Sequence, residues 1–200
     1  ITKAYSFDLS RRMVEVGEDP VMPVVETTAE KILNIDKLAL MDKNKVKVIL
    51  TRDETRLFNL LDRRNLSTNF GTKIDGQLLE VNTDRTRARY KIVTDKPGEE
   101  TIDFNIRITA ILEEKEDPTQ LNQKGLHKIE EQFSKELSQA VKNVLEKIQK
   151  TGLDPLGFGL RYGGTHWNNQ TEMEEWSAIY PHAKFNVSVR FKIKSTGYKR

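Results

Sequence analysis

The chain of 200 residues contains no cysteine, which excludes disulfide bonds, thiolate nucleophiles and cysteine-ligated zinc within it. It also lacks any apolar run near the roughly 20 residues that a membrane-spanning helix needs, and it shows no signal peptide. Because the chain starts at Ile1 within polar sequence, we expect it to be a piece of a longer protein whose targeting segment lies upstream. The net charge is only +3, so no overall basic field favours nucleic acid as a partner.

The sequence carries none of the short motifs that indicate a catalytic centre or a cofactor site. There is no GxSxG, Walker A, GxGxxG or HExxH pattern, and His127, His166 and His182 are not spaced as metal ligands. Adjacent acids such as Asp53 and Glu54 are better explained by the start of a helix. We therefore predict no enzymatic activity, no cofactor and no metal site.

The first third of the chain predicts a small α+β unit. The Gly17–Pro23 stretch, with two prolines three apart, favours turns and extended backbone over helix. Residues 32–41 and 46–50 then predict a β-hairpin. Thr51 and Glu54 form a capping box that opens a helix to about Arg63. A polar break follows at 65–69, so we predict a hairpin-plus-helix domain over residues 1–65.

Residues 66–200 predict a second, larger α+β domain. Three strands over 70–81, 86–93 and 101–112 indicate an antiparallel meander, with a tight turn at 82–84 between the first two. Apolar residues spaced three or four apart over 120–150 predict a long amphipathic helix. A last alternating strand over 185–193 has to join the meander. The expected fold class is thus α+β, with an antiparallel four-stranded sheet packed against a long helix and shorter helices.

The stretch Gln149–Gly159, QKTGLDPLGFG, connects the long helix to the shorter ones. Gly152 stands where a left-handed helix cap is expected, and Asp154-Pro155 predicts an N-cap followed by the first helical residue. A second capping box at Thr171 opens a helix that carries Trp176. Trp167 and Trp176 mark either a ligand or partner surface or ordinary core packing. We single out these motif residues: Gln149, Asp154, Pro155, Gly157, Gly159 and Trp176.

Basic side chains alternate along two of the predicted strands and therefore share one face of each. They are Arg85, Arg87, Arg89 and Lys91 on the first, and Arg190, Lys192 and Lys194 on the second. If both strands lie in one sheet, its outer face carries a basic patch. Either it is an ordinary solvated face balanced by acids such as Asp103, or it contacts anionic lipid headgroups. Nucleic acid is disfavoured because no aromatic residue interleaves with these charges.

The order of these elements resembles the C-terminal region of the Ger(x)C family, the lipoprotein C subunits of spore germinant receptors. The likeness is strongest from about Ile129 to Gly197, and a second likeness covers Leu38 to Glu54. It implies a longer protein, lipid-anchored on the outer face of the inner spore membrane, that acts with membrane-embedded A and B subunits in nutrient-triggered germination. It also implies a three-domain α+β protein, of which residues 1–65 form part of the middle domain and 66–200 the C-terminal one. The family has no established catalytic residues to transfer.

Two functional hypotheses follow. In the first, the chain is a non-enzymatic scaffold that docks on membrane partners and leaves apolar patches exposed when isolated. In the second, it binds a small nutrient in a concave pocket with a few convergent polar groups. A generic domain that binds anionic membrane surfaces is a further alternative.

Overall fold

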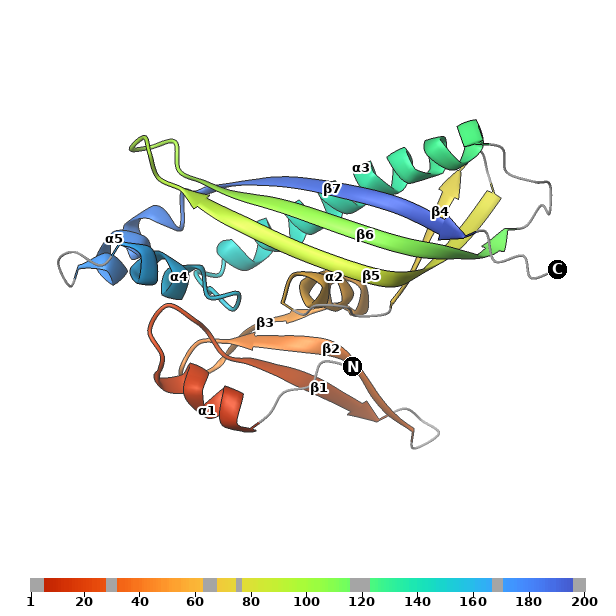
Figure 1. Cartoon of the computed structure of the whole chain (residues 1–200). Coiled ribbons are helices and arrows are strands. Elements are labelled where there is room, and N and C mark those ends of the chain that lie inside the picture. The colour runs from red at the N-terminus through yellow and green to blue at the C-terminus, as the bar shows by residue number, and fades with distance from the viewer. Residues whose placement is uncertain are drawn as a thin grey trace.

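The computed structural model describes residues 6–27, 32–62, 68–74, 77–115, 123–166 and 171–195. These residues form two β-sheets and five helices (Figure 1). The first sheet contains β1 (Val21–Thr27), β2 (Leu33–Met41) and β3 (Val46–Leu50), and the second contains β4 (Asn69–Ile74), β5 (Gln77–Val93), β6 (Thr101–Lys115) and β7 (Lys184–Ser195). The helices are α1 (Ser6–Val14), α2 (Arg52–Asp62), α3 (Gln123–Gln149), α4 (Phe158–Thr165) and α5 (Glu172–Ile179).

The predicted hairpin is part of a three-stranded antiparallel sheet in the order β1-β2-β3. The proline-containing segment supplies β1, with Pro23 opposite Leu38. A proline has no N–H to donate to a partner strand, and β1 tolerates it because β1 lies at the sheet edge. The prolines predicted extended chain correctly, but they did not show that this chain would pair.

The second sheet has four strands in the order β4-β5-β6-β7, and it is mixed rather than antiparallel. β7 runs parallel to β6, with Thr101 opposite Lys184 and Ala110 opposite Ile193. The prediction of an all-antiparallel sheet is therefore wrong. The physical reason is α3, which spans about 40 Å and carries the chain back along the sheet to the end where β6 started.

β5 is one long strand, so the predicted turn at 82–84 is also wrong. Instead, β4 pairs antiparallel with the start of β5, Ile74 opposite Gln77, and β5 passes through Asn82 with a register irregularity between Thr83 and Arg85. The extra residue of such a bulge switches which side chains face inward. Thr83 and Thr86 are consequently both buried although they are three residues apart.

Helix α2 joins the two sheets, because it packs against β2 and β3 on one side and against β5 and α3 on the other (Figure 1). Leu40 of the first sheet, Phe58 of α2 and Val81 of the second sheet belong to one buried apolar cluster. The capping box that starts α2 is confirmed: the Thr51 amide donates to Glu54 Oε2 at 2.8 Å, and the Glu54 amide donates to Thr51 Oγ1 at 3.3 Å. The predicted domain boundary after residue 65 falls in the segment 63–67, outside the described residues, and stays a prediction.

Helix α3 closes the free edge of β7 with its own side chains. The Val189 amide donates to the Ser138 hydroxyl and the Phe191 amide to the Ser134 hydroxyl, both at 3.1 Å. The Ile193 amide donates to Glu130 Oε1 at 2.9 Å. These three acceptors stand four residues apart on α3 and therefore line one face of the helix. The helix thereby satisfies backbone donors that a further strand would otherwise pair.

Candidate functional site

The motif residues of the 149–159 stretch lie where this stretch contacts the loop Gly17–Asp19 before β1. We call this contact between the two halves of the chain the junction. Asp154 is only 6% exposed, and its carboxylate accepts hydrogen bonds from the amides of Phe158 at 3.0 Å and Gly159 at 2.7 Å. It therefore satisfies the first-turn donors of α4. The prediction that Asp154 caps a helix is right in chemistry but wrong in position, because residue Gly157, at a φ of 68°, is the N-cap.

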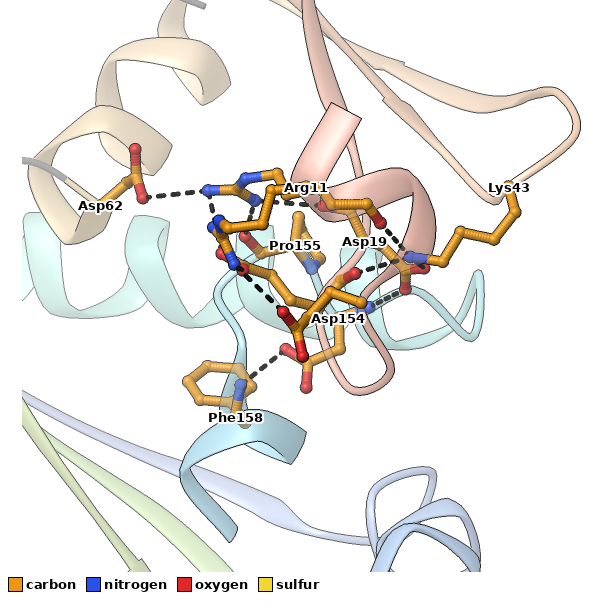
Figure 2. A network of polar contacts seen from close by, with 10 residues as sticks. Arg11, Asp19, Lys43, Asp62, Asp154, Pro155 and Phe158 are labelled. Carbon is orange, nitrogen blue, oxygen red and sulfur yellow. Dashed lines mark hydrogen bonds and ion pairs between the residues drawn. The ribbon is translucent and has the colours of Figure 1, made fainter. Parts of the chain in front are cut away.

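Burial raises the pKa of Asp154 to about 7. Hydrogen bonds from the Gly159 and Phe158 amides, and the Trp176 indole, lower this pKa but do not outweigh burial. Asp154 also forms two hydrogen bonds with Asp19 of the N-terminal half. Its amide donates to Asp19 Oδ2 at 2.7 Å, and the Asp19 amide donates to the Asp154 carbonyl at 3.0 Å (Figure 2). The same residue thus starts α4 and binds the loop before β1.

The two chain segments approach so closely at this point that glycine is required on both sides. Gly17 has a φ of 88°, and a Cβ placed on it would lie 2.8 Å from the backbone of Gly159 and of Leu160. A Cβ on Gly159 would lie 2.7 Å from Trp176 Cδ1. The Leu160 amide donates to the Gly17 carbonyl at 3.1 Å. The motif glycines therefore serve close packing rather than phosphate binding.

Arg12 of α1 completes the junction, and the sequence analysis did not single it out. Its Nη1 donates to the Pro155 carbonyl at 2.8 Å, and its Nη2 lies 3.1 Å from Glu18 Oε1 and 3.8 Å from Asp62 Oδ1. Lys43 donates to the Arg12 carbonyl and, at 2.8 Å, to the Glu18 carbonyl. The partner Pro155 is 143 residues away in sequence, so no local pattern reveals this contact.

Gln149 and Trp176 hold the other side of the same region. The Gln149 side-chain amide donates to the carbonyls of Tyr180 at 2.6 Å and Ala183 at 2.8 Å, which ties the end of α3 to the start of β7. Trp176 is buried and its ring lies 5.2 Å from Tyr162 and 5.4 Å from Tyr180. Trp176 thus packs in the core, whereas Trp167 lies outside the described residues.

The capping box predicted at Thr171 does not form. Thr171 precedes α5, but its hydroxyl donates to Glu175 Oε1 at 3.0 Å and makes no hydrogen bond to a backbone amide of the helix. The Glu175 side chain competes with the backbone for this hydroxyl, a contact that the spacing of Thr171 and Glu174 does not reveal.

All seven basic residues that alternate along two strands lie exposed on the same outer face, because β5 and β7 both flank β6 in one sheet. The register places Arg87 opposite Arg107, and Arg107 opposite Arg190. Arg107 of β6 was not part of the predicted patch, although its position in the strand alternation was a usable signal. We call this surface the basic face and define it by Arg85, Arg87, Arg89, Lys91, Arg107, Arg190, Lys192 and Lys194.

A shallow groove of about 570 Å³ runs between α3 and β7. Its walls carry His127, Glu131 and Lys135 from the helix and Arg190 from the strand. His127 Nε2 lies 3.1 Å from Glu131 Oε1. The groove combines both signs of charge and is open to solvent.

Large apolar side chains are exposed only in the N-terminal part of the described chain. On the first sheet, Met22 and Ile49 flank Ala39 on the face opposite to the buried Leu38, Leu40 and Leu50. We call this face of the first sheet the apolar surface and define it by Met22 and Ile49. Other exposed apolar residues in the N-terminal part include Phe7, Val14, Val16, Val25 and Val46. Beyond Ile49, no described large apolar residue is exposed.

The described residues contain neither a candidate membrane-spanning helix nor a candidate metal site. None of the helices there combines the length and apolar character that crossing a bilayer requires. No group of three or more histidine, cysteine, aspartate or glutamate side chains lies together there in a way that suits a metal ion.

The chain matches the family model described as "Spore germination B3/ GerAC like, C-terminal" over residues 36–197. The chain belongs to this family. Curated relatives include spore germination protein GerQC of Bacillus cereus, 22% identical over 98% of this chain and 54% of the relative, and spore germination protein KC of Bacillus subtilis (strain 168), 27% identical over 92% and 47%. The chain therefore spans about half the length of the curated relatives it matches.

The fold is shared with a solved structure described as the crystal structure of the GerBC protein. The two superpose with a TM-score of 0.76 at 20% sequence identity, covering 89% of this chain and 57% of that one. This agreement confirms the α+β fold class, and the parallel β7 corrects the predicted sheet. The resemblance to the germination family is confirmed by the family match over residues 36–197.

The region matched to the GerAC-like family contains the whole 149–159 motif and the whole basic face. It begins at residue 36, so α1, β1 and the Gly17–Asp19 side of the junction precede it. In this chain, the region matched to the family is therefore bound to the preceding segment by the hydrogen bonds of Asp154 with Asp19 and of Pro155 with Arg12.

Proposed function

We propose that this chain is part of a germinant-receptor C subunit that acts without catalysis in nutrient-triggered spore germination. In this proposal the subunit docks with the membrane-embedded A and B subunits of its receptor. Membership of the GerAC-like family and relatives named as spore germination proteins support the role in germination. The apolar surface is the observation that carries the docking.

The apolar surface has the character of an interface that is empty in the isolated chain. Met22 is 39% exposed and Ile49 is 49% exposed, in one row on the outward face of the first sheet. Large apolar side chains left exposed on a folded domain favour sites for protein partners or membranes, because leaving them in water costs roughly 25 cal/mol per Å². In the proposed receptor, this face would contact the membrane-embedded subunits.

Acting without catalysis fits the way in which the perturbed ionisable groups are used. The Asp154 carboxylate accepts from two backbone amides at the start of α4. Tyr180, whose pKa is raised by burial, donates its hydroxyl to the Leu153 carbonyl at 2.8 Å. Both groups are buried and committed to backbone partners, which supports a structural role for each.

The proposal includes a location. We propose that the full-length protein is held on the outer face of the inner spore membrane by a lipid anchor, as the family resemblance implies. Fractionation of spore membranes with an antibody to this chain tests it: recovery in the inner-membrane fraction supports the proposal, and recovery in the soluble core fraction contradicts it.

The experiment on function uses the gene in its own organism. We expect deletion to abolish dipicolinate release on nutrient addition and to leave release by a non-nutrient trigger unchanged. To remove redundancy, the gene is also restored, with its receptor partners, to a strain that lacks the other receptors. Failure to restore any nutrient response there would contradict the proposed function.

A paired variant tests the docking surface. Met22→Glu with Ile49→Glu places two charges on the apolar surface, and Gln139→Glu with Ala178→Glu places two on exposed positions of α3 and α5. We expect the first pair to abolish the nutrient response and co-purification of the A and B subunits at unchanged protein level. The second pair is expected to behave as wild type. A wild-type response from both pairs would exclude docking through this surface.

Nutrient binding is a second candidate, favoured by the groove between α3 and β7. Its volume lies within the range of small-molecule sites, and Lys135 and Glu131 present opposite charges that suit a zwitterion. A thermal-shift screen against amino acids, sugars and nucleosides separates the candidates. Saturable stabilisation that Lys135→Ala and Arg190→Ala both remove would favour the binding module over the scaffold.

A further inference from the structure

The basic face is a row of like charges at matched register. Arg87, Arg107 and Arg190 lie directly opposite one another on three adjacent strands. Like charges at opposed positions of a sheet repel and destabilise it. A sheet that places three arginines in one row therefore carries a cost that a negatively charged partner would remove.

Within the described chain, few of these charges are neutralised. Lys192 lies 2.5 Å from Glu130, and Lys194 lies 3.6 Å from Asp84. Asp103 stands opposite Lys91 at one end of the face and accepts a hydrogen bond from Asn186. Among the described residues no ion pair forms with the remaining side chains of the face, which are Arg85, Arg87, Arg89, Lys91, Arg107 and Arg190.

The other residues of this face determine what kind of partner it suits. Between the charges lie Asn105 and Thr109 of β6 and Ser188 of β7, all polar and without an aromatic ring. Protein interfaces use buried aromatic and apolar anchors, and single-stranded nucleic acids need rings on which bases stack. A long strand pair that offers mainly positive charge and small polar groups fits an extended anionic surface. β5 alone is about 55 Å long.

We propose that the basic face binds the anionic headgroups of a lipid bilayer. This contact is separate from the germination role and from the apolar surface, which belongs to the other sheet. It would orient the four-stranded sheet flat against the membrane, with α3 and the first sheet on the side away from the lipid. Figure 1 shows α2 and the first sheet together on one side of the four-stranded sheet.

Co-sedimentation of the purified chain with vesicles tests the proposal. We expect binding to phosphatidylcholine vesicles that contain phosphatidylglycerol, no binding to phosphatidylcholine alone, and release by about 0.5 M salt, at which charges are screened within a few ångströms. Absence of binding to the anionic vesicles at low salt would overturn the proposal.

The charge variant Arg87→Gln with Arg107→Gln and Arg190→Gln is compared with a matched control, Lys45→Gln with Lys124→Gln and Lys150→Gln, which removes three exposed charges elsewhere. At roughly fivefold for each basic residue near an anionic surface, we expect the first variant to bind about 100-fold more weakly and the control nearly as wild type. Equal loss in both variants would show a mere net-charge effect and overturn the proposal.

Two soluble polyanions complete the test. Tighter binding to a polyglutamate peptide or to a single-stranded oligonucleotide than to the anionic vesicles would assign the face to a different class of partner and overturn the lipid proposal. Thermal melts of all variants are recorded alongside, because these exposed substitutions are expected to leave the melting temperature unchanged or slightly raised. These measurements use purified protein, so their outcome is independent of whether the germination role holds.

Discussion

The two sheets of this protein treat their outer faces in opposite ways. The first sheet buries Leu38 and Leu40 against α2 but leaves Met22 and Ile49 partly in water on its other side. The second sheet buries its inner face under α3, and the exposed side chains at the centre of its outer face are polar or basic. A sheet with apolar side chains on both faces is stable only when a partner buries the second face. A sheet with one charged face can leave that face in water or place it against opposite charge.

The junction is one of the contacts between the N-terminal and C-terminal halves of the chain. The largest effect on stability is expected from a substitution of Gly17. Gly17→Ala adds a Cβ against the backbone of Gly159 and strains a left-handed residue, so we expect a loss of about 4 kcal/mol in the free energy of unfolding. Gly98→Ala is the matched control, since Gly98 has a φ of 83° with nothing within 4 Å, and it is expected to cost about 1 kcal/mol. Equal losses in urea denaturation would mean that the two loops are not in contact.

A second change affects the C-terminal sheet alone. Ser134→Ala with Ser138→Ala leaves the Phe191 and Val189 amides without acceptors, and we expect a loss of about 2 kcal/mol. Ser177→Ala removes a hydroxyl with the same bond to the carbonyl four residues earlier but no strand partner, and it should be nearly neutral. If denaturation shows no difference between the variants, the helix does not hold the edge of β7.

The pH dependence of stability reports on the junction through Asp154. Its pKa is raised from about 3.9 in the unfolded chain to about 7, so the folded form alone holds the proton between these values. Stability is therefore greatest below pH 4 as far as this group is concerned, and it falls by about 1.4 kcal/mol per pH unit as the pH rises towards 7. Asp154→Asn should remove this slope in denaturation curves recorded from pH 4 to 8. A slope that persists in the variant would assign it to other groups.

The smallest effect is expected on the basic face and has the opposite sign. Arg107→Gln removes the central charge of the row of three arginines, so we expect the free energy of unfolding to rise by about 0.5 kcal/mol at low salt and to converge with wild type at high salt. Arg161→Gln is the comparison on another surface, where the guanidinium lies 4.8 Å from the Tyr90 ring and its loss is expected to destabilise. A fall in stability for Arg107→Gln would show that the row is not repulsive.

Much of the fold was predictable because alternation and helical spacing are local. The strand around Ile106 and the helix around Phe133 follow directly from these patterns. The direction of β7 and the path of β5 through Asn82 were not, since alternation carries no information on strand direction and a bulge resembles a turn in composition.

For the candidate site, the sequence pointed to individual residues but did not reveal which partners they contact. Asp154 and Gly159 were among the motif residues named from the sequence, but their contacts with Asp19 and Gly17 join segments that only the folded chain brings together. The strand alternation places Arg107 on the outward side of β6, but the row that it forms with Arg87 and Arg190 appears only when the three strands are aligned.

The parallel pairing of β6 with β7 has a consequence for how the chain folds. β5 and β6 are joined by a short connection and can pair early, but β7 reaches β6 only after the chain has passed through α3, α4 and α5. Closing so long a loop costs chain entropy before any contact between the two strands offsets it. Until then Phe133, which stacks on Phe191 at 4.7 Å, lies on an uncovered stripe of the helix. Docking of β7 is therefore expected to be the late, rate-limiting step of folding, and the stage at which the nascent protein is most prone to aggregate.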